Sequence, residues 1–271
     1  MAWSPDANSQ VLALLATPSV LYAGGAFTRV GGQIRNNVAA LDFTNGQPTA
    51  WDPNSDGQVA ALAVSGNTVY LGGLFDAVGG QLRNNLAAVD ATTGLPTPWT
   101  ADTDDQVFTL DASTNMVYVG GNFSEQSGQP RLFVGAVDPV TGAASAWNPT
   151  ASGTVRAVAP VCDRVYLGGF FTSIGGQPRN RAAAVNLTTG APLSWDPNAN
   201  GPVFALLPAA GTVYLGGVLS TVGNQTRNRA AAADPTTGAV TSWNPNSNGT
   251  VRAYAVNANS VFIGGAFSSM N

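Results

Sequence analysis

Tryptophan occurs only at positions 3, 51, 99, 147, 195 and 243, so the spacing between consecutive tryptophans never changes. Other residue types return at the same interval: Val at 11, 59, 107, 155, 203 and 251, and an aromatic residue at Tyr22, Tyr70, Tyr118, Tyr166, Tyr214 and Phe262. A Gly-Gly pair follows each aromatic residue, and no insertion interrupts the register. We therefore predict one domain over residues 1–271, built from six repeats that start at Trp3, Trp51, Trp99, Trp147, Trp195 and Trp243, the sixth of them truncated.

Each repeat has the residue pattern of short strands. In the second repeat, runs rich in apolar and β-branched residues are separated by the breakers Ser65-Gly66-Asn67 and Thr92-Thr93-Gly94, which supply the positive φ angles of tight turns. The pattern predicts four strands, at 59–64, 68–73, 85–90 and about 96–100. No segment between the breakers is long enough for a useful helix.

Four antiparallel strands repeated every 40 to 50 residues or so are typical of a propeller blade. We therefore predict an all-β chain: a β-propeller of four-stranded antiparallel blades with a 48-residue repeat, about six blades, and the last blade incomplete. Each tryptophan is expected to be buried between adjacent blades. The last blade should lack its third strand, and the strand edges that this leaves open favour self-association.

The repeat resembles those of known propeller families. Val69-Tyr70-Leu71-Gly72-Gly73, with Asp90, Gly94 and Trp99 downstream, is similar to kelch blades and to the tryptophan-docking motif of quinoprotein propellers. The whole unit looks like the delta-60 type repeat of large secreted and surface-attached bacterial proteins. That resemblance implies an extracellular propeller and brings no catalytic residues with it. The third repeat departs from the pattern at Thr100-Ala101-Asp102 and at Leu132-Phe133.

Composition argues against several classes of function. The chain has no Lys, no His, one Cys and a net charge of −4. Without a broad positive surface, nucleic acid is not expected as a partner. The missing residue types exclude a Ser-His-Asp triad, His-ligated metals and an internal disulfide. No apolar segment is long enough to span a bilayer, so we expect no membrane insertion.

A recurring arginine is the first candidate for ligand binding. It stands at Arg35, Arg83, Arg131, Arg179 and Arg227. A propeller would place these residues in a ring on one rim, where guanidinium groups could bind an anionic ligand. The alternative, which we favour, is that each Arg braces its own loop through backbone carbonyls or through the Asp seven residues later.

Two acidic segments are weak metal candidates. Asp52, Asn54 and Asp56 match the first half of a calcium loop, but Ala63 stands where the bidentate Glu is expected. Asp102, Asp104 and Asp105 form a second acidic group. A polar turn between blades explains both segments better than a metal site does.

Two further candidates concern catalysis. Cys162 falls in the turn between the first two strands of its repeat, and without a His it lacks a base partner for a catalytic thiol. Glu125 is the only Glu and lies in a loop equivalent to that of Asp76, yet nothing in the sequence pairs them as the acid and base of a glycosidase.

These observations favour a non-enzymatic extracellular propeller that acts as a binding or structural interaction module. The repeats offer mostly symmetry, whereas an enzyme needs one asymmetric site. The alternatives are a multivalent lectin-like propeller with one weak site per blade, and a fragment of a hydrolase or quinoprotein-like enzyme. We expect no cofactor, and a protein or glycan partner. We expect a location outside the cell or on its surface, although the chain shows no signal peptide.

Overall fold

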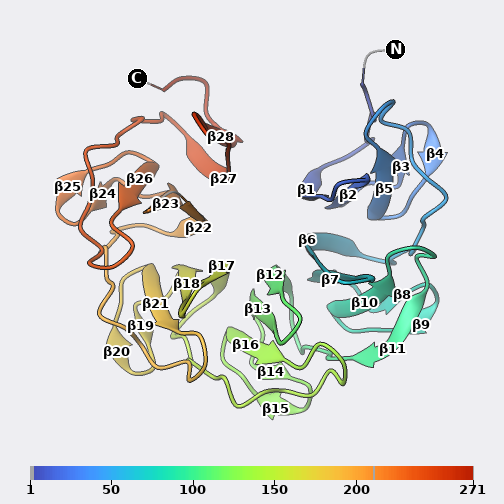
Figure 1. Ribbon diagram of the computed structural model, residues 1–271, viewed down its shortest axis with the longest axis horizontal. Coiled ribbons are helices and arrows are strands. Elements are labelled where there is room, and N and C mark those ends of the chain that lie inside the picture. Colours follow the sequence, from blue (N-terminus) through green and yellow to red (C-terminus); the bar gives the residue numbers. More distant parts are fainter. Residues whose placement is uncertain (1–2, 210, 271) are drawn as a thin grey trace. The chain divides into compact units, whose positions relative to one another are not determined.

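The computed structural model describes residues 3–209 and 211–270, and these residues form strands, turns and connecting segments (Figure 1). Contacts group the chain into two compact units. The first unit comprises Met1–Arg131 and Ala136–Ser145, and the second comprises Leu132–Gly135 and Ala146–Asn271. Within the described residues no helix is suited to crossing a membrane.

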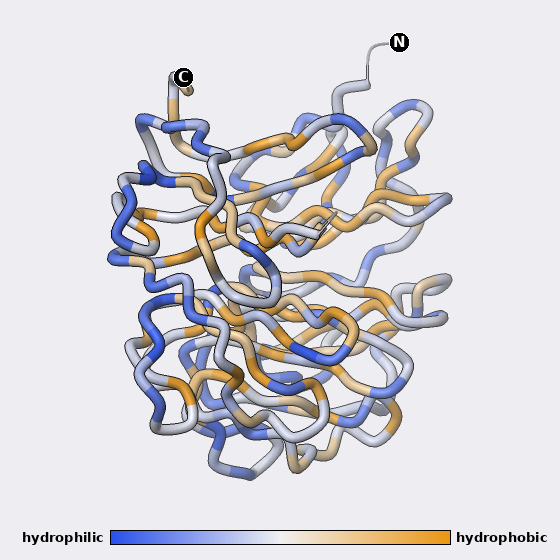
Figure 2. Tube along the Cα trace, turned by 60° about the vertical axis from the view of Figure 1, so that its left-hand side comes forward, coloured by the Kyte–Doolittle hydropathy of each residue, from blue (hydrophilic) through white to orange (hydrophobic). Residues whose placement is uncertain are grey.

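Each repeat begins with an antiparallel pair of strands. The first strands are β1 (Val11–Ala16), β6 (Gln58–Ser65), β12 (Val107–Ala112), β17 (Val155–Val161), β22 (Val203–Ala209) and β27 (Thr250–Val256). The second strands are β2 (Val20–Gly25), β7 (Thr68–Leu74), β13 (Val117–Gly121), β18 (Arg164–Gly169), β23 (Thr212–Gly217) and β28 (Val261–Ala266). In Figure 2 the hydrophobic colour follows many of these strands, and much of the hydrophilic colour lies in the segments that join them.

A third strand completes the sheet of five repeats. These strands are β5 (Val38–Asp42), β10 (Leu86–Asp90), β16 (Val134–Val137), β21 (Ala182–Asn186) and β26 (Ala230–Ala233). Each pairs with the second strand of its repeat. In the last repeat the described residues form only the pair β27-β28.

The fourth strand forms fully in one repeat. β11 (Pro96–Thr100) pairs with β10 and gives the sheet order β11-β10-β7-β6, which matches the four predicted ranges. In four other repeats the equivalent segment makes only a single bridge, such as Leu41↔Pro48. The difference follows from residues 100 and 101. Thr100-Ala101 extends the pairing, whereas the other repeats continue with Asp-Pro or Asn-Pro, and proline has no N–H for a ladder.

The loop between the second and third strands carries a small hairpin that the sequence reading did not include. The hairpin strands are β3 (Arg29–Val30) and β4 (Gln33–Ile34), β8 (Ala77–Val78) and β9 (Gln81–Leu82), β14 (Glu125–Gln126) and β15 (Gln129–Pro130), β19 (Ser173–Ile174) and β20 (Gln177–Pro178), and β24 (Thr221–Val222) and β25 (Gln225–Thr226). The two turn residues have positive φ, 56° and 74° at Gly31 and Gly32. Two such residues between short strands form the turn that suits the twist of a hairpin.

Neighbouring repeats pack a valine of the first strand against a glycine of the preceding repeat. A Cβ atom on Gly72 would lie 2.5 Å from Cγ1 of Val107, and one on Gly216 would lie 2.6 Å from Cγ1 of Val251. Both valines are fully buried. At these two positions the first glycine of the Gly-Gly pair is therefore required by close packing between sheets.

Burial of the tryptophans follows the prediction at four of six positions. Trp51, Trp99, Trp147 and Trp195 are buried. Trp243 is half-buried and Trp3 is exposed, so the expectation that every tryptophan would be buried is wrong for these two. The reason lies in the surroundings: each buried tryptophan begins a repeat that has a third strand and follows another repeat, whereas the described part of the last repeat, which Trp243 begins, has no third strand, and Trp3 begins the first repeat.

Candidate functional site

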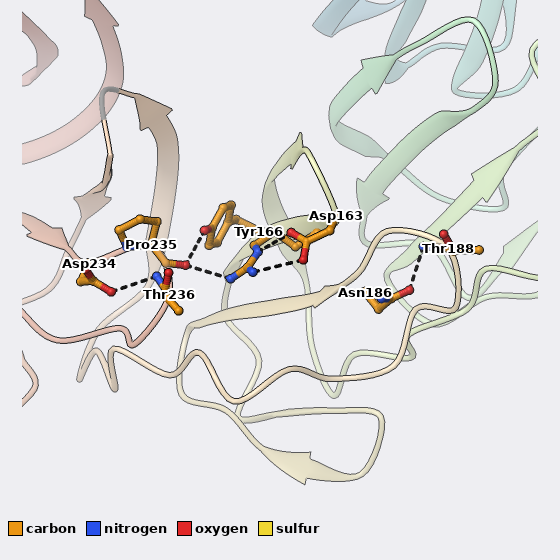
Figure 3. Close-up of polar contacts among 8 residues, drawn as sticks. Asp163, Tyr166, Asn186, Thr188, Asp234, Pro235 and Thr236 are labelled. Atoms are coloured by element: carbon orange, nitrogen blue, oxygen red, sulfur yellow. Dashed lines mark hydrogen bonds and ion pairs between the residues drawn. The ribbon is translucent and has the colours of Figure 1, made fainter.

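The tryptophans make hydrogen bonds within their own repeats, and the tyrosines join adjacent repeats. Nε1 of Trp51 donates to the carbonyl of Asp90, and Nε1 of Trp195 donates to the carbonyl of Asp234, at 3.0 and 2.8 Å. In the second unit, the Tyr166 hydroxyl and Nη1 of Arg164 both donate to the carbonyl of Pro235, at 2.7 and 3.0 Å (Figure 3). These aromatic residues therefore have packing roles.

The five recurring arginines are directed at backbone carbonyls. In each, Nη1 donates to the carbonyl of the preceding residue. Nη2 donates to a carbonyl fourteen residues later, at 2.5 to 2.7 Å. The structure shows the local bracing that we favoured, made by carbonyls and not by the Asp seven residues on. The anion-binding role of Arg35, Arg83, Arg131, Arg179 and Arg227 stays a prediction.

The segment Asp52 to Asp56 links two loops of the first unit. Oδ2 of Asp52 lies 3.8 Å from Nη1 of Arg35. Asn54 has a φ of 55° and accepts a hydrogen bond from the amide of Asn36. Oδ1 of Asp56 accepts the backbone N–H groups of Asp76 and Ala77, both at 3.0 Å. Each of the three candidate ligands thus has a partner within the protein, and metal binding here stays a prediction.

The third repeat carries an open acidic cleft of about 580 Å³ within the first unit, lined by Asp102, Asp104 and Glu125 among others. Burial opposes ionisation of Asp104, but hydrogen bonds from Ser124 and Glu125 outweigh it and lower the pKa of that carboxyl. Asp102 accepts the backbone N–H of Asn84. Asp105 accepts bonds from Gln106 and Asn122 and does not line the cleft. Among the described residues, no group of three or more His, Cys, Asp or Glu is placed to hold a metal ion.

The two catalytic candidates are not assembled into a site. Cys162 is an exposed free thiol with a φ of 52°, in the turn between β17 and β18, as the sequence predicts. It does not line the acidic cleft. Glu125 lines that cleft and Asp76 does not, so the cleft does not bring the two carboxylates together.

A row of side chains that the sequence reading missed lies on β-bulges. In every repeat the pairing of the first two strands shifts by one residue, for example between Val155 and Ala157. The extra residue is left out of the ladder, and a bulge of this kind re-aims its side chain. We call the bulged positions Leu12, Ala60, Phe108, Arg156, Phe204 and Arg252 the bulge row.

The second unit contributes two arginines and a phenylalanine to this row, here called the Arg-Phe-Arg cluster: Arg156, Phe204 and Arg252. The guanidinium carbons of Arg156 and Arg252 lie 5.6 and 5.9 Å from the centre of the Phe204 ring. The ring of Phe170, an exposed residue, lies 5.7 Å from that of Phe204. Two cations and one aromatic ring therefore gather on adjacent strands, with the ring of Phe170 beside them.

The electrostatics of this cluster are unfavourable for the protein alone. Burial and then the positive charge of Arg252 lower the pKa of Arg156. Attraction to the ring face offsets part of this cost, since a cation over an aromatic ring is worth about 0.5–2 kcal/mol. A negative charge placed between the two guanidinium groups would relieve the repulsion.

A signal for the cluster is present in the sequence. The column directly after the recurring valine reads Leu, Ala, Phe, Arg, Phe and Arg through the six repeats. Its neighbour is valine in all six. A column that varies in size and charge beside an unchanging valine indicates side chains that are not fixed by core packing, and all six are exposed or half-buried.

No protein-family model matches the chain, and no curated protein sequence matches it either. Solved structures do. A chain of a mitotic checkpoint complex is similar with a TM-score of 0.64 and 16% identity, over 93% of this chain and 69% of that one. The WD40 domain of Pan2 from Neurospora crassa has a TM-score of 0.57 and 14% identity, over 91% of this chain and 68% of that one. The computationally designed protein Ika8 has a TM-score of 0.56 and 16% identity, over 96% and 95%.

These similarities establish the fold. The chain is an all-β protein of the β-propeller class, with antiparallel sheets in repeated blades like those of WD40 domains. The predicted fold class is confirmed at that level.

Proposed function

We propose that this protein is a non-catalytic interaction module that binds a protein partner through the Arg-Phe-Arg cluster. The observation that carries the proposal is the gathering of Arg156, Arg252 and Phe204 on bulges of adjacent strands. The similarity to the Pan2 WD40 domain and to a chain of a mitotic checkpoint complex supports a protein-binding role.

The chemistry of the cluster selects an acidic segment with apolar residues. Guanidinium groups bind carboxylates through paired hydrogen bonds, and Arg is enriched where planar groups of this kind are recognised. Phe204 and Phe170 supply aromatic surface for an apolar side chain of the partner. Relief of the repulsion between Arg156 and Arg252 adds to the binding of an anion.

Fluorescence anisotropy with a labelled peptide of alternating Glu and Leu residues tests this proposal. We expect binding that weakens at least about tenfold in the variant R156Q/R252Q, because losing one charged contact costs about 1.5–3 kcal/mol. The control R29Q/R164Q removes the same charge from Arg29 and Arg164, outside the cluster, and should keep most of the affinity. A peptide with Lys in place of Glu should not bind.

Two results would contradict the proposal. Equal losses in R156Q/R252Q and R29Q/R164Q would show attraction to net charge alone. Binding of a sulfated glycan in preference to the peptide would favour the lectin-like alternative.

We further propose that the protein acts outside the cell, a placement that rests on the resemblance of its repeat to surface-attached propellers. Labelling of intact source cells by an antibody against this chain would support the placement. Labelling only after lysis would contradict it.

A further inference from the structure

The small hairpin of the fifth repeat differs from the other four hairpins at two positions. The second residue of its turn is Asn224, where the other four turns have glycine: Gly32, Gly80, Gly128 and Gly176. Two residues later it has Thr226, where the others have Ile34, Leu82, Pro130 and Pro178. The residue between the two is glutamine in all five hairpins. Together the two changes create Asn-Gln-Thr, a sequence in which asparagine accepts an N-linked oligosaccharide.

The tip of the hairpin has the backbone and the space that such a group requires. Asn224 has a φ of 62°, in the left-handed region that asparagine tolerates better than most residues with a Cβ atom. It is exposed, as are Gln225 and Thr226. At each of the four equivalent glycines, an added Cβ atom would meet no atom of the described residues within 4 Å. A side chain at this position therefore extends away from the protein.

The base of the hairpin is held in place, which keeps the tip outward. Oδ1 of Asn200 accepts the backbone N–H groups of Ser220 and Thr221, both at 2.9 Å. Nη2 of Arg227 donates to Oε1 of Gln225 at 2.8 Å, so the middle side chain of the Asn-Gln-Thr sequence is directed at that arginine. Within residues 3–209 and 211–270, the side-chain amide of Asn224 makes no hydrogen bond.

Two other asparagines in Asn-x-Ser or Asn-x-Thr sequences use their amide nitrogens inside the fold. Nδ2 of Asn122 donates to Asp105 at 2.8 Å, and Nδ2 of Asn248 donates to Ser268 at 2.9 Å. A sugar on either nitrogen would displace a bond that joins two segments of the chain. These two sites are therefore poorer acceptors than Asn224.

A fourth such asparagine, Asn186, has a role in a turn. It occupies the column of Asp42, Asp90, Asp138 and Asp234. Like those carboxylates, its Oδ1 accepts the backbone N–H groups two and three residues later, from Thr188 and Thr189 at 3.0 and 2.8 Å (Figure 3). The turn explains its sequence, whereas the other hairpins show that Asn224 and Thr226 are not needed to form the hairpin.

We propose that Asn224 carries an N-linked oligosaccharide. The inference rests on the proposed location outside the cell, because this modification belongs to secreted proteins. The donor is an oligosaccharide linked to a lipid diphosphate. Nδ2 of Asn224 forms a bond to C1 of the first sugar and loses a proton, while the bond from C1 to the diphosphate oxygen breaks and the lipid diphosphate leaves. No group is oxidised or reduced.

Mass spectrometry of the full chain from the surface of source cells tests the assignment. An amidase that removes N-linked oligosaccharides converts each occupied asparagine to aspartate, so the occupied position is read directly. We expect aspartate at position 224 after this treatment and asparagine there without it. An unmodified Asn224 in the surface protein overturns the proposal, and so does an oligosaccharide on Asn122 or Asn248 with none on Asn224.

Tagged full-length variants expressed in the same cells separate the motif from other causes. T226I installs the residue found at position 34 and should lose the oligosaccharide, while circular dichroism shows that the fold is kept. The matched control T226S preserves the acceptor sequence and should remain modified. G80N/L82T transfers the sequence to the second repeat, where Leu82 is 78% exposed, and should gain a second oligosaccharide. An oligosaccharide that persists in T226I overturns the assignment.

The location and the modification can fail separately. Antibody labelling of intact cells together with an unmodified Asn224 leaves the proposed location standing and removes this inference. Labelling only after lysis removes both. A modified Asn224 in protein from intact cells supports both.

Discussion

Gln126 is a buried amide in a column of aliphatic residues. The equivalent residues are Val30, Val78, Ile174 and Val222, all buried. Gln126 is fully buried as well, and neither its Nε2 nor its Oε1 has a hydrogen-bond partner. Leaving a buried amide unpaired costs about 1–3 kcal/mol in proteins, so this residue weakens the third repeat.

We predict that Q126I stabilises the protein by about 1 to 3 kcal/mol, since it removes the unpaired amide and places there the residue found at 174. Urea denaturation should show a higher midpoint with an unchanged slope. The control Q129I alters an exposed glutamine of the same hairpin and should change stability little. A less stable Q126I would show that the amide contributes a bond of its own.

Asp111 is the carboxyl with the largest change in acidity. Burial in β12 raises its pKa from 3.8 to about 6, and a hydrogen bond from the backbone of Ala112 only partly opposes this. The folded protein therefore retains the proton between those pH values, where the unfolded chain releases it. It follows that folding stability falls as pH rises through this window and stays lower above it.

We predict that D111A raises the stability at pH 7 by about 1 to 2 kcal/mol, because the raised pKa of Asp111 costs free energy there and partial exposure reduces that cost. Alanine fits because it stands at the equivalent positions 63 and 159. When D111A is unfolded thermally at pH values from 3 to 8, its stability should no longer decline between about pH 4 and pH 6. D42A should have the opposite effect at pH 7, because hydrogen bonds from Thr44 lower the pKa of Asp42 and so stabilise its ionised form. Unchanged pH dependence in D111A would contradict the assignment.

At the scale of strands, stability depends on how closely the second strand of one repeat approaches the first strand of the next. A Cβ atom added to Gly216 of β23 would lie 2.6 Å from Cγ1 of Val251 of β27. Dense packing transmits such a clash because a core has little free volume. A Cβ atom on Gly264, the same position in β28, would meet only Cβ of Ala253, at an ordinary contact distance of 3.8 Å.

We predict that G216A destabilises the protein by about 1 to 3 kcal/mol through overpacking. The matched variant G264A should be neutral or slightly stabilising, because alanine restricts the unfolded chain more than glycine does. Denaturant unfolding at low protein concentration measures both without interference from association. Equal changes in stability for G216A and G264A would show that the strand propensity of alanine determines them. The close contact with Val251 would then not be the cause.

At the scale of the whole chain, the constant register means that a whole repeat can be removed without changing how the remaining repeats pair. Its hydrogen bonds and ring contacts connect residues within a repeat, as between Arg83 and Thr97, or in nearby repeats, as between Tyr22 and Ala91. Proteins built in this way have stabilities that are approximately sums over repeats and their interfaces.

We predict that deletion of residues 51–98, one full repeat, leaves a folded protein. Tyr22 then meets Trp99, and Gly24 meets Val107, as each now meets the equivalent residue of the second repeat. Circular dichroism per residue should be retained and unfolding should stay cooperative. Deletion of residues 51–74 breaks the register and should give an aggregated product. Similar behaviour of the two deletions would contradict a repeat-based architecture.

The strands were predictable where the determining information is local. Ranges 59–64 and 68–73 were recognisable because glycine turns bound them and apolar residues fill them, and β6 and β7 match them closely. The small hairpins escaped notice because their strands are only two residues long. Most fourth strands do not form because a proline follows two residues after the tryptophan and cannot donate a backbone hydrogen bond. The position of this proline in the pairing becomes clear only when the partner strand is known.

The sequence by itself determined the repeat, its constant period, the strand order and the propeller class, because periodicity and turn residues act over short distances along the chain. Only the tertiary structure decided which side chains meet. The carbonyls that bind the recurring arginines carry no residue-type signal. The gathering of Arg156, Phe204 and Arg252 joins positions one and two repeats apart, through bulges that set side-chain direction. Such contacts depend on the spacing between sheets, which arises when the repeats pack.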